Sequence, residues 1–141
     1  MDQATKASIQ NDVSYYKEFQ NLFVIFCEDL INALNESNQH DIELGVGDTI
    51  SRNLKILDHP CKIDFGIHRS RLGLRGKMIF YRLISPEQKE LFWTLYFDNA
   101  GNTYNGPEWD TPLHSLKGND ITNWIVPQIL QYILKNLVKP T

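Results

Sequence analysis

The sequence predicts a single α+β domain spanning residues 1–141, an antiparallel sheet of four to six strands flanked by an N-terminal and a C-terminal helix. Apolar residues recur at helical spacing before residue 36 and again after residue 119, and they alternate with polar residues in between. An unbroken block of strands between two helices is typical of an α+β layer pair. We therefore expect both helices to pack on one face of the sheet.

The first helix is predicted over roughly residues 12–36. Asn11 or Asp12 is the expected N-cap, with an earlier start near Thr5 as the alternative, and the polar run 36–41 ends the helix. Its apolar residues follow the i, i+3, i+4 rule through four turns and define one buried stripe. They are Phe19, Leu22, Phe23, Phe26, Cys27, Leu30, Ile31 and Leu34.

The first predicted strands lie between residues 42 and 84. Residues 42–46 form a short strand loosened by glycine, and residues 54–56 form another. Residues 61–67 alternate strictly between apolar and polar, which indicates a strand with one buried face. A turn over residues 69–73 leads into the next strand, residues 74–84.

The strand over residues 91–97 is aromatic on both faces. Strict alternation places Leu91 and Trp93 together on one face, and Phe92 and Tyr96 on the other, where they need cover from a loop or a partner. Turns are predicted at residues 85–88 and 98–102, before a return strand that starts at residue 103.

The C-terminal part is predicted to be a loop over residues 105–118 followed by a helix. Asn119 or Asp120 is the expected N-cap of this helix. Pro127 falls inside the apolar pattern and is expected to kink the helix.

The cysteine content and the N-terminus favour a cytoplasmic protein. Cys27 and Cys61 both fall within apolar patterns, so we expect two buried free thiols, with a disulfide or a reactive thiol as the alternative. The first ten residues are polar with one lysine, unlike a secretory signal. The longest apolar run, residues 22–27, is too short to span a membrane, so no membrane partner is expected.

Charge is segregated along the chain, whose net charge is −3. Residues 1–60 hold four Lys or Arg against ten Asp or Glu, whereas residues 61–89 hold seven against two. The middle of an acidic protein is therefore basic, which is typical of a surface that recognises acidic groups.

The chain lacks the common motifs of catalysis and metal binding. It has no H-x-x-x-H, no C-x-x-C, no G-x-S-x-G and no phosphate-binding glycine loop. No catalytic residue, metal ligand or cofactor is therefore predicted. The alternative is an enzyme site assembled in space, from His68 or His114 with Asp64, Glu108 or Asp110.

Two local features are candidates for binding. His68, Arg69, Arg71, Arg75 and Lys77 gather around a predicted β-turn with no acid among them. They either pair with the protein's own acidic helix or recognise an acidic protein or a phosphate. The second candidate is the loop 106–114, in which Trp109 either folds back over the core or contacts a partner.

These features predict a non-enzymatic protein-binding module, such as an inhibitor, an immunity or antitoxin-like protein, a chaperone or an adaptor. The expected contacts are the basic hairpin and Trp109. The alternative is a nucleic-acid or phosphate-ligand binder that uses the same hairpin, with Tyr81 stacking on a base. Spare apolar surface, including Val24 and Ile25, favours either a well-covered monomer or a homodimer.

Overall fold

The computed structural model describes residues 3–36, 50–56 and 59–137. In chain order its elements are α1 (Gln3–Glu36), β1 (Ser51–Ile56), β2 (His59–Ser70), β3 (Gly73–Ser85), β4 (Gln88–Phe97), β5 (Thr103–Tyr104), η1 (Ile121–Ile125) and α2 (Val126–Leu137). The α+β class is confirmed. The short strand predicted at residues 42–46 lies outside the described residues.

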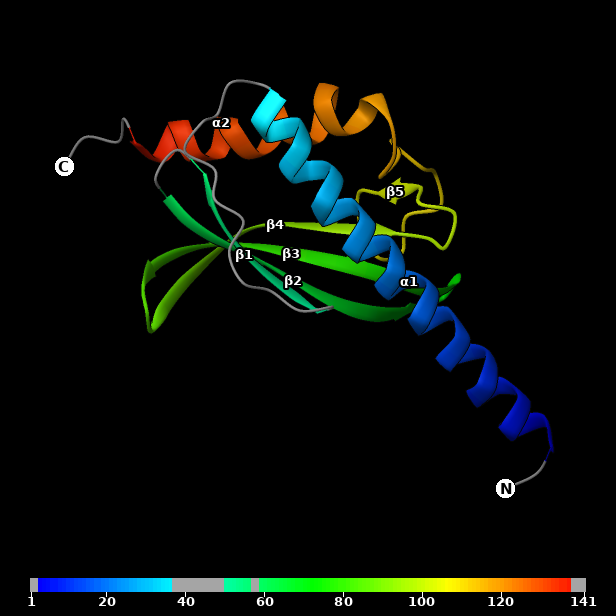
Figure 1. The fold of residues 1–141 in the computed structure, drawn as a ribbon. Coiled ribbons are helices and arrows are strands. Elements are labelled where there is room, and N and C mark those ends of the chain that lie inside the picture. The colour runs from blue at the N-terminus through cyan, green and yellow to red at the C-terminus, as the bar shows by residue number, and fades with distance from the viewer. Residues whose placement is uncertain (1–2, 37–49, 57–58, 138–141) are drawn as a thin grey trace.

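The five strands form one sheet in the order β1-β2-β3-β4-β5, and each strand runs antiparallel to its neighbours. Each strand pairs with the next strand along the chain, as expected where local pairing is favoured. Figure 1 shows α1 crossing the strands diagonally, with its N-terminal part extending beyond the edge of the sheet. That extension follows from the start of α1 at Gln3, so the expected N-cap at Asn11 or Asp12 is wrong and the earlier start holds.

One hydrophobic core joins the helices and the sheet. Its strand residues occupy alternate positions, so the pleat turns them all towards one side. They are Leu54, Ile56, Cys61, Ile63, Met78, Phe80, Leu95 and Phe97. The same cluster includes Phe19, Phe23, Phe26 and Leu30 of α1, Ile121 and Ile125 of η1, and Ile129 and Ile133 of α2.

A β-bulge interrupts the alternation of β4. Phe80 pairs with Trp93 but Tyr81 pairs with Leu91, so Phe92 has no residue opposite it. Leu91 is consequently 53% exposed, while the ring of Phe92 stacks on Tyr132 of α2 at a centroid distance of 4.1 Å. The prediction that Leu91 shares the face of Trp93 is wrong, and Phe92 finds its cover within the chain.

The C-terminal helix begins with a π-helical turn. The N–H of Val126 donates to the carbonyl of Ile121, five residues back, just before Pro127, which has no N–H to donate. Asp120 makes no side-chain cap, because its carboxylate accepts a hydrogen bond from the backbone N–H of Ser115 at 2.9 Å. Asp120 therefore occupies the predicted N-cap position, but its side chain does not cap the helix.

Both cysteines are buried free thiols, as predicted. Burial raises the pKa of Cys27 and that of Cys61 to about 12. Both thiols are therefore protonated and unreactive near neutral pH. Among the described residues, no helix is long and apolar enough to cross a bilayer.

Candidate binding surface at the hairpin end

The structure brings together the two candidate features that the sequence presents separately. The turn between β2 and β3 lies against the loop 105–114, and Glu108 joins them. Its carboxylate accepts hydrogen bonds from the backbone N–H of Arg71 at 2.9 Å and from Nε of Arg71 at 3.1 Å. We call this region the hairpin end, and it comprises residues 68–75, residues 104–110 and the facing turns of α1.

Arg69 and Arg71 each have an acidic partner within the chain. Arg69 contacts Asp12 of α1 at 2.5 Å, and Arg71 contacts Glu108 at 3.1 Å. Both guanidinium side chains stay largely exposed, at 64% for Arg69 and 86% for Arg71. Because exposed ion pairs are screened and contribute little to stability, these arginines remain accessible to other carboxylates.

The hydrogen bonds from Arg71 also set the charge of Glu108. The backbone N–H of Arg71 is the main cause that lowers the pKa of this carboxyl, followed by its guanidinium. His68 Nε2 lies 4.0 Å from Glu108 Oε1, so a protonated His68 reinforces the same effect. Glu108 is therefore ionised at neutral pH and holds the loop to the hairpin.

Arg75 is held differently from its neighbours, because its residue is only 6% exposed. Its Nη1 donates to the backbone carbonyls of Gly106 at 3.2 Å and Pro107 at 3.0 Å. Its guanidinium carbon lies 3.7 Å from the ring centroid of Tyr104, a cation–π contact. Within the described part of the chain, no carboxylate forms an ion pair with Arg75.

Tyr104 connects this cation to the turn after β4. Its hydroxyl donates to Asp98 Oδ2 at 2.7 Å, and Asp98 also accepts from the backbone N–H groups of Ala100 and Asn102. Burial is the main cause that raises the pKa of Tyr104, and the hydrogen bond to Asp98 adds to it. Tyr104 therefore remains a neutral donor across the physiological range.

A cavity of about 390 Å³ opens beside Arg75, between α1, the hairpin and the turn after β4. Both polar and apolar side chains line it. The lining residues are Tyr15, Phe19, Leu72, Gly73, Leu74, Arg75, Asp98, Asn99 and Tyr104.

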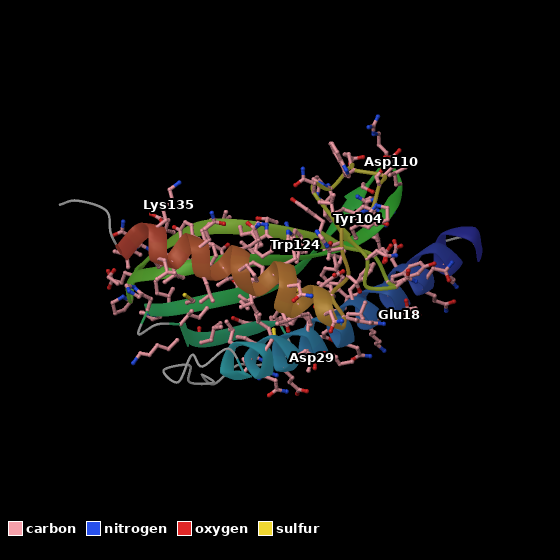
Figure 2. All side chains as sticks on the ribbon, turned by 90° about the horizontal axis from the view of Figure 1, so that it is seen from above. Glu18, Asp29, Tyr104, Asp110, Trp124 and Lys135 are labelled. Carbon is pink, nitrogen blue, oxygen red and sulfur yellow. The ribbon has the colours of Figure 1, made fainter. Side chains whose placement is uncertain are left out.

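Large apolar side chains are exposed around the same end. Leu72 is 58% exposed at the turn and Trp109 is 50% exposed on the loop, so Trp109 does not fold back over the core. Val13 and Tyr15 on α1 are 49% and 43% exposed. Figure 2 shows the loop residue Asp110 and Tyr104 near the N-terminal half of α1, far from Lys135 at the other end of the molecule.

Lys77 lies just outside the residues that define the hairpin end, two positions along β3 from Arg75. In the sheet it pairs with Gly66 and Tyr96, and its side-chain carbons extend over Gly66. Its position in β3 alternates with the buried Met78, so it belongs to the face opposite the core.

That opposite face carries a group of lysines that sequence reasoning missed. We call it the lysine face, and its cationic and large apolar strand residues include Lys55, Lys62, Lys77, Lys89, Ile79, Tyr81, Leu91 and Tyr96. Among the described strand residues of this face, the one carboxylate is Asp64, which lies 3.6 Å from Lys62 and 3.9 Å from Lys89. The alternation of these lysines with core residues was the signal available in the sequence.

The histidines that the structure describes do not form hydrogen-bonded pairs with carboxylates. The closest approaches in the described structure are 4.0 Å between His68 and Glu108 and 3.8 Å between His114 and Asp120. The ring of His114 instead stacks on Trp124 at a centroid distance of 4.0 Å. Across the described ranges, no three metal-ligating residues gather in one place.

Comparison of the chain with protein-family models, with curated proteins and with solved structures gave no match. Its function therefore has to be inferred from its own residues.

Proposed function

We propose that this protein is a non-enzymatic protein-binding module that binds an acidic partner through the hairpin end. Inhibitors, immunity or antitoxin-like proteins, chaperones and adaptors belong to this class. One observation carries the proposal: exposed Leu72 and Trp109 lie beside exposed Arg71 at one end of the sheet. Tryptophan and arginine are the residue types most enriched at the energetic centres of protein interfaces.

The ion pairs at this end are compatible with such binding. Arg69 and Arg71 are paired with acids of the chain itself, but those acids are also accessible, with 39% of each side chain exposed. A partner carboxylate can replace Asp12 at small cost, because both states are solvated ion pairs, and Arg71 keeps N–H donors beyond the one that binds Glu108. The exposed charges then guide the encounter, and Leu72 and Trp109 supply the buried area.

The arrangement of the helices supports this placement. We infer that both helices cover the same face of the sheet, because buried residues of α1, α2 and alternate strand positions form one cluster. In Figure 1, α2 lies above the strands and α1 crosses them diagonally. The hairpin end and the lysine face then remain available to a partner.

The test compares capture of partners by matched variants. The full-length chain, the Trp109→Ala/Arg71→Glu variant and a Leu134→Ala control are immobilised and exposed to host lysate at low salt. Leu134 is 51% exposed on α2, distant in the fold from the hairpin end. We expect a stoichiometric protein on the wild-type chain and on the control, and loss of it on the double variant.

Native mass measurement of the recovered complex gives its stoichiometry and shows whether a second copy of the chain is present. Equal capture by the double variant would place the partner elsewhere on the surface. The absence of any stoichiometric protein on the wild-type chain would remove the proposal.

A second candidate function is nucleic-acid binding on the lysine face. The observation in its favour is that Lys62, Lys77 and Lys89 surround Tyr81 and Tyr96, and that Asp64 is the one carboxylate among the described strand residues of this face. Bases stack on such aromatic side chains, and ammonium groups contact the phosphates. The hairpin arginines support this candidate less, since Arg75 is buried and Arg69 and Arg71 have internal partners.

Salt dependence distinguishes the two candidates. A labelled single-stranded oligonucleotide is titrated by fluorescence anisotropy with the wild-type chain, Lys77→Glu and the control Lys135→Glu. Nucleic-acid binding predicts an affinity that falls steeply with salt and is weakened by Lys77→Glu alone. No binding at low salt, or binding insensitive to salt, rules this candidate out.

A further inference from the structure

Arg75 is a buried cation whose hydrogen-bonding capacity is only partly used. A guanidinium has five N–H donors, and in Arg75 the described acceptors, the carbonyls of Gly106 and Pro107, both bind Nη1. Burying a charge without a counter-ion is costly, and neutral carbonyls and an aromatic ring compensate for it only in part. The site is therefore electrostatically suited to receive an anion.

The cavity beside Arg75 offers room for that anion and for an apolar group attached to it. Arg75 lines the cavity, and so do the aromatic residues Tyr15, Phe19 and Tyr104 and the aliphatic residue Leu72. A volume of about 390 Å³ falls within the range of ordinary small-ligand sites, which are mostly apolar with a few placed polar groups.

Asp98 also lines the cavity, but its carboxylate is already engaged. Oδ1 accepts from the backbone N–H groups of Ala100 and Asn102, and Oδ2 accepts from the Asn102 amide and the Tyr104 hydroxyl. All four donors belong to the chain itself, so both oxygens of Asp98 are engaged. Arg75 is thus the charged group with donors left for a ligand.

We propose that this cavity binds a carboxylate carried on an apolar peptide segment of the protein partner, with Arg75 as its counter-ion. The inference rests on the proposed function and specifies the chemistry of the partner. Leu72 connects the cavity with the proposed protein-binding surface, because it lines the cavity and is also 58% exposed at the hairpin end. A peptide lying across Leu72 can therefore place an acidic side chain, or its terminal carboxylate, against the guanidinium.

The first experiment uses the intact wild-type chain and a pair of probes. The probes are N-acetyl-leucyl-phenylalanine with a free carboxylate and the same dipeptide with a terminal amide. Titration is followed by ¹H–¹⁵N correlation spectra. We expect the acid to shift the amide signals of residues 72–75 and 98–104 saturably, and to bind about tenfold more tightly than the amide, as a charge-assisted contact implies.

Equal affinity of acid and amide, or shifts that map outside these residues, would overturn the proposal. This comparison needs no variant, so it stands even if Arg75→Gln fails to fold.

A matched pair of surface variants then tests the location. Leu72→Glu places a negative charge at the cavity, and Ile84→Glu places the same charge at a site 49% exposed near the turn between β3 and β4. We expect Leu72→Glu to abolish binding of the acid probe and Ile84→Glu to retain it. Identical binding by the two variants contradicts a site beside Leu72.

The experiments distinguish failure of the protein-binding function from failure of the anion site. If lysate capture finds no partner while the acid probe binds at the cavity, the anion site stands and the protein-binding function falls. If a partner is captured and lost with Trp109→Ala/Arg71→Glu, but acid and amide probes bind equally, the function stands and the anion site falls.

Discussion

The guanidinium carbon of Arg75 lies 3.7 Å from the centre of the Tyr104 ring, and this contact connects two segments that are distant in the sequence. Arg75 belongs to β3, and Tyr104 belongs to the short strand that begins the long loop. The same arginine donates to the loop carbonyls of Gly106 and Pro107. The loop that carries Trp109 is thereby fixed against the hairpin rather than left independent of it.

Gly76→Ala is expected to destabilise the fold. A Cβ at this position would lie 2.3 Å from Cζ of Phe97, whose side chain is fully buried and cannot move aside. Overpacking of this kind typically costs about 1–3 kcal/mol. Urea denaturation measures the loss, with Gly66→Ala as the control, because its Cβ meets only the flexible Lys77 side chain at 3.0 Å. Equal stability of the two variants would contradict the packing of Phe97 over β3.

The bulge in β4 predicts unequal losses of stability for two adjacent substitutions. Phe92→Ala removes the ring that stacks on Tyr132 and should cost about 2–3 kcal/mol, somewhat less than a fully buried phenylalanine. Leu91→Ala should change the free energy of unfolding by no more than about 0.5 kcal/mol, because Leu91 is 53% exposed. Thermal denaturation of both variants measures these losses. If the strand alternated strictly, Leu91→Ala would be the more destabilising of the two substitutions.

Tyr132 should make stability depend on pH in the alkaline range. Its hydroxyl contacts Glu90, and burial together with this carboxylate raises its pKa from 10.0 to about 12. Since the folded state holds the proton more tightly than the unfolded state, the stabilisation is complete below pH 10 and is lost as the pH approaches about 12.

Urea denaturation of the wild-type chain and Tyr132→Phe at several pH values isolates this contribution. Cys27 and Cys61 also have raised pKa values and make stability depend on pH in both proteins. Subtracting the unfolding free energy of Tyr132→Phe from that of the wild-type chain cancels their contribution. We expect the difference in unfolding free energy to shrink across that interval. A difference that stays constant with pH would show that Tyr132 ionises normally.

The two thiols should resist modification in the folded protein. Burial raises the pKa of Cys27 and of Cys61 to about 12, so thiolate is scarce and reagent access is blocked. A chromogenic disulfide reagent at neutral pH should react slowly with the native chain and rapidly, at two equivalents, with the urea-unfolded chain. Fast reaction of either thiol under native conditions would indicate local opening around it.

Local patterns in the sequence predicted the helices and strands. They did not predict the bulge in β4, which depends on how this strand pairs with β3. Residues 61–67 form part of β2, as predicted, but Ile67 at the end of the predicted buried face is 39% exposed. Residues 91–97 also alternate, yet Phe92 is a bulge, because the register of β4 depends on how β3 presents Phe80 and Tyr81. No property of the β4 segment alone distinguishes these two cases.

The same division holds for the candidate site. The sequence predicted that basic residues surround one β-turn and that Trp109 lies on a long loop, but it did not indicate that the two meet. Glu108 and Arg71 are 37 residues apart in sequence, and Asp12 and Arg69 are 57 apart. No local pattern in the sequence distinguishes Arg75 from Arg69 and Arg71. Arg75 is buried because the loop packs against it.

The sequence by itself determined the α+β class, the helix–strands–helix order and the two buried thiols, because hydrophobic periodicity acts between near neighbours. The tertiary structure alone decided which cations face solvent, which are paired and which one lines a cavity. The physical reason is that the state of a charge depends on burial and on nearby opposite charges, and both come from residues remote in the chain.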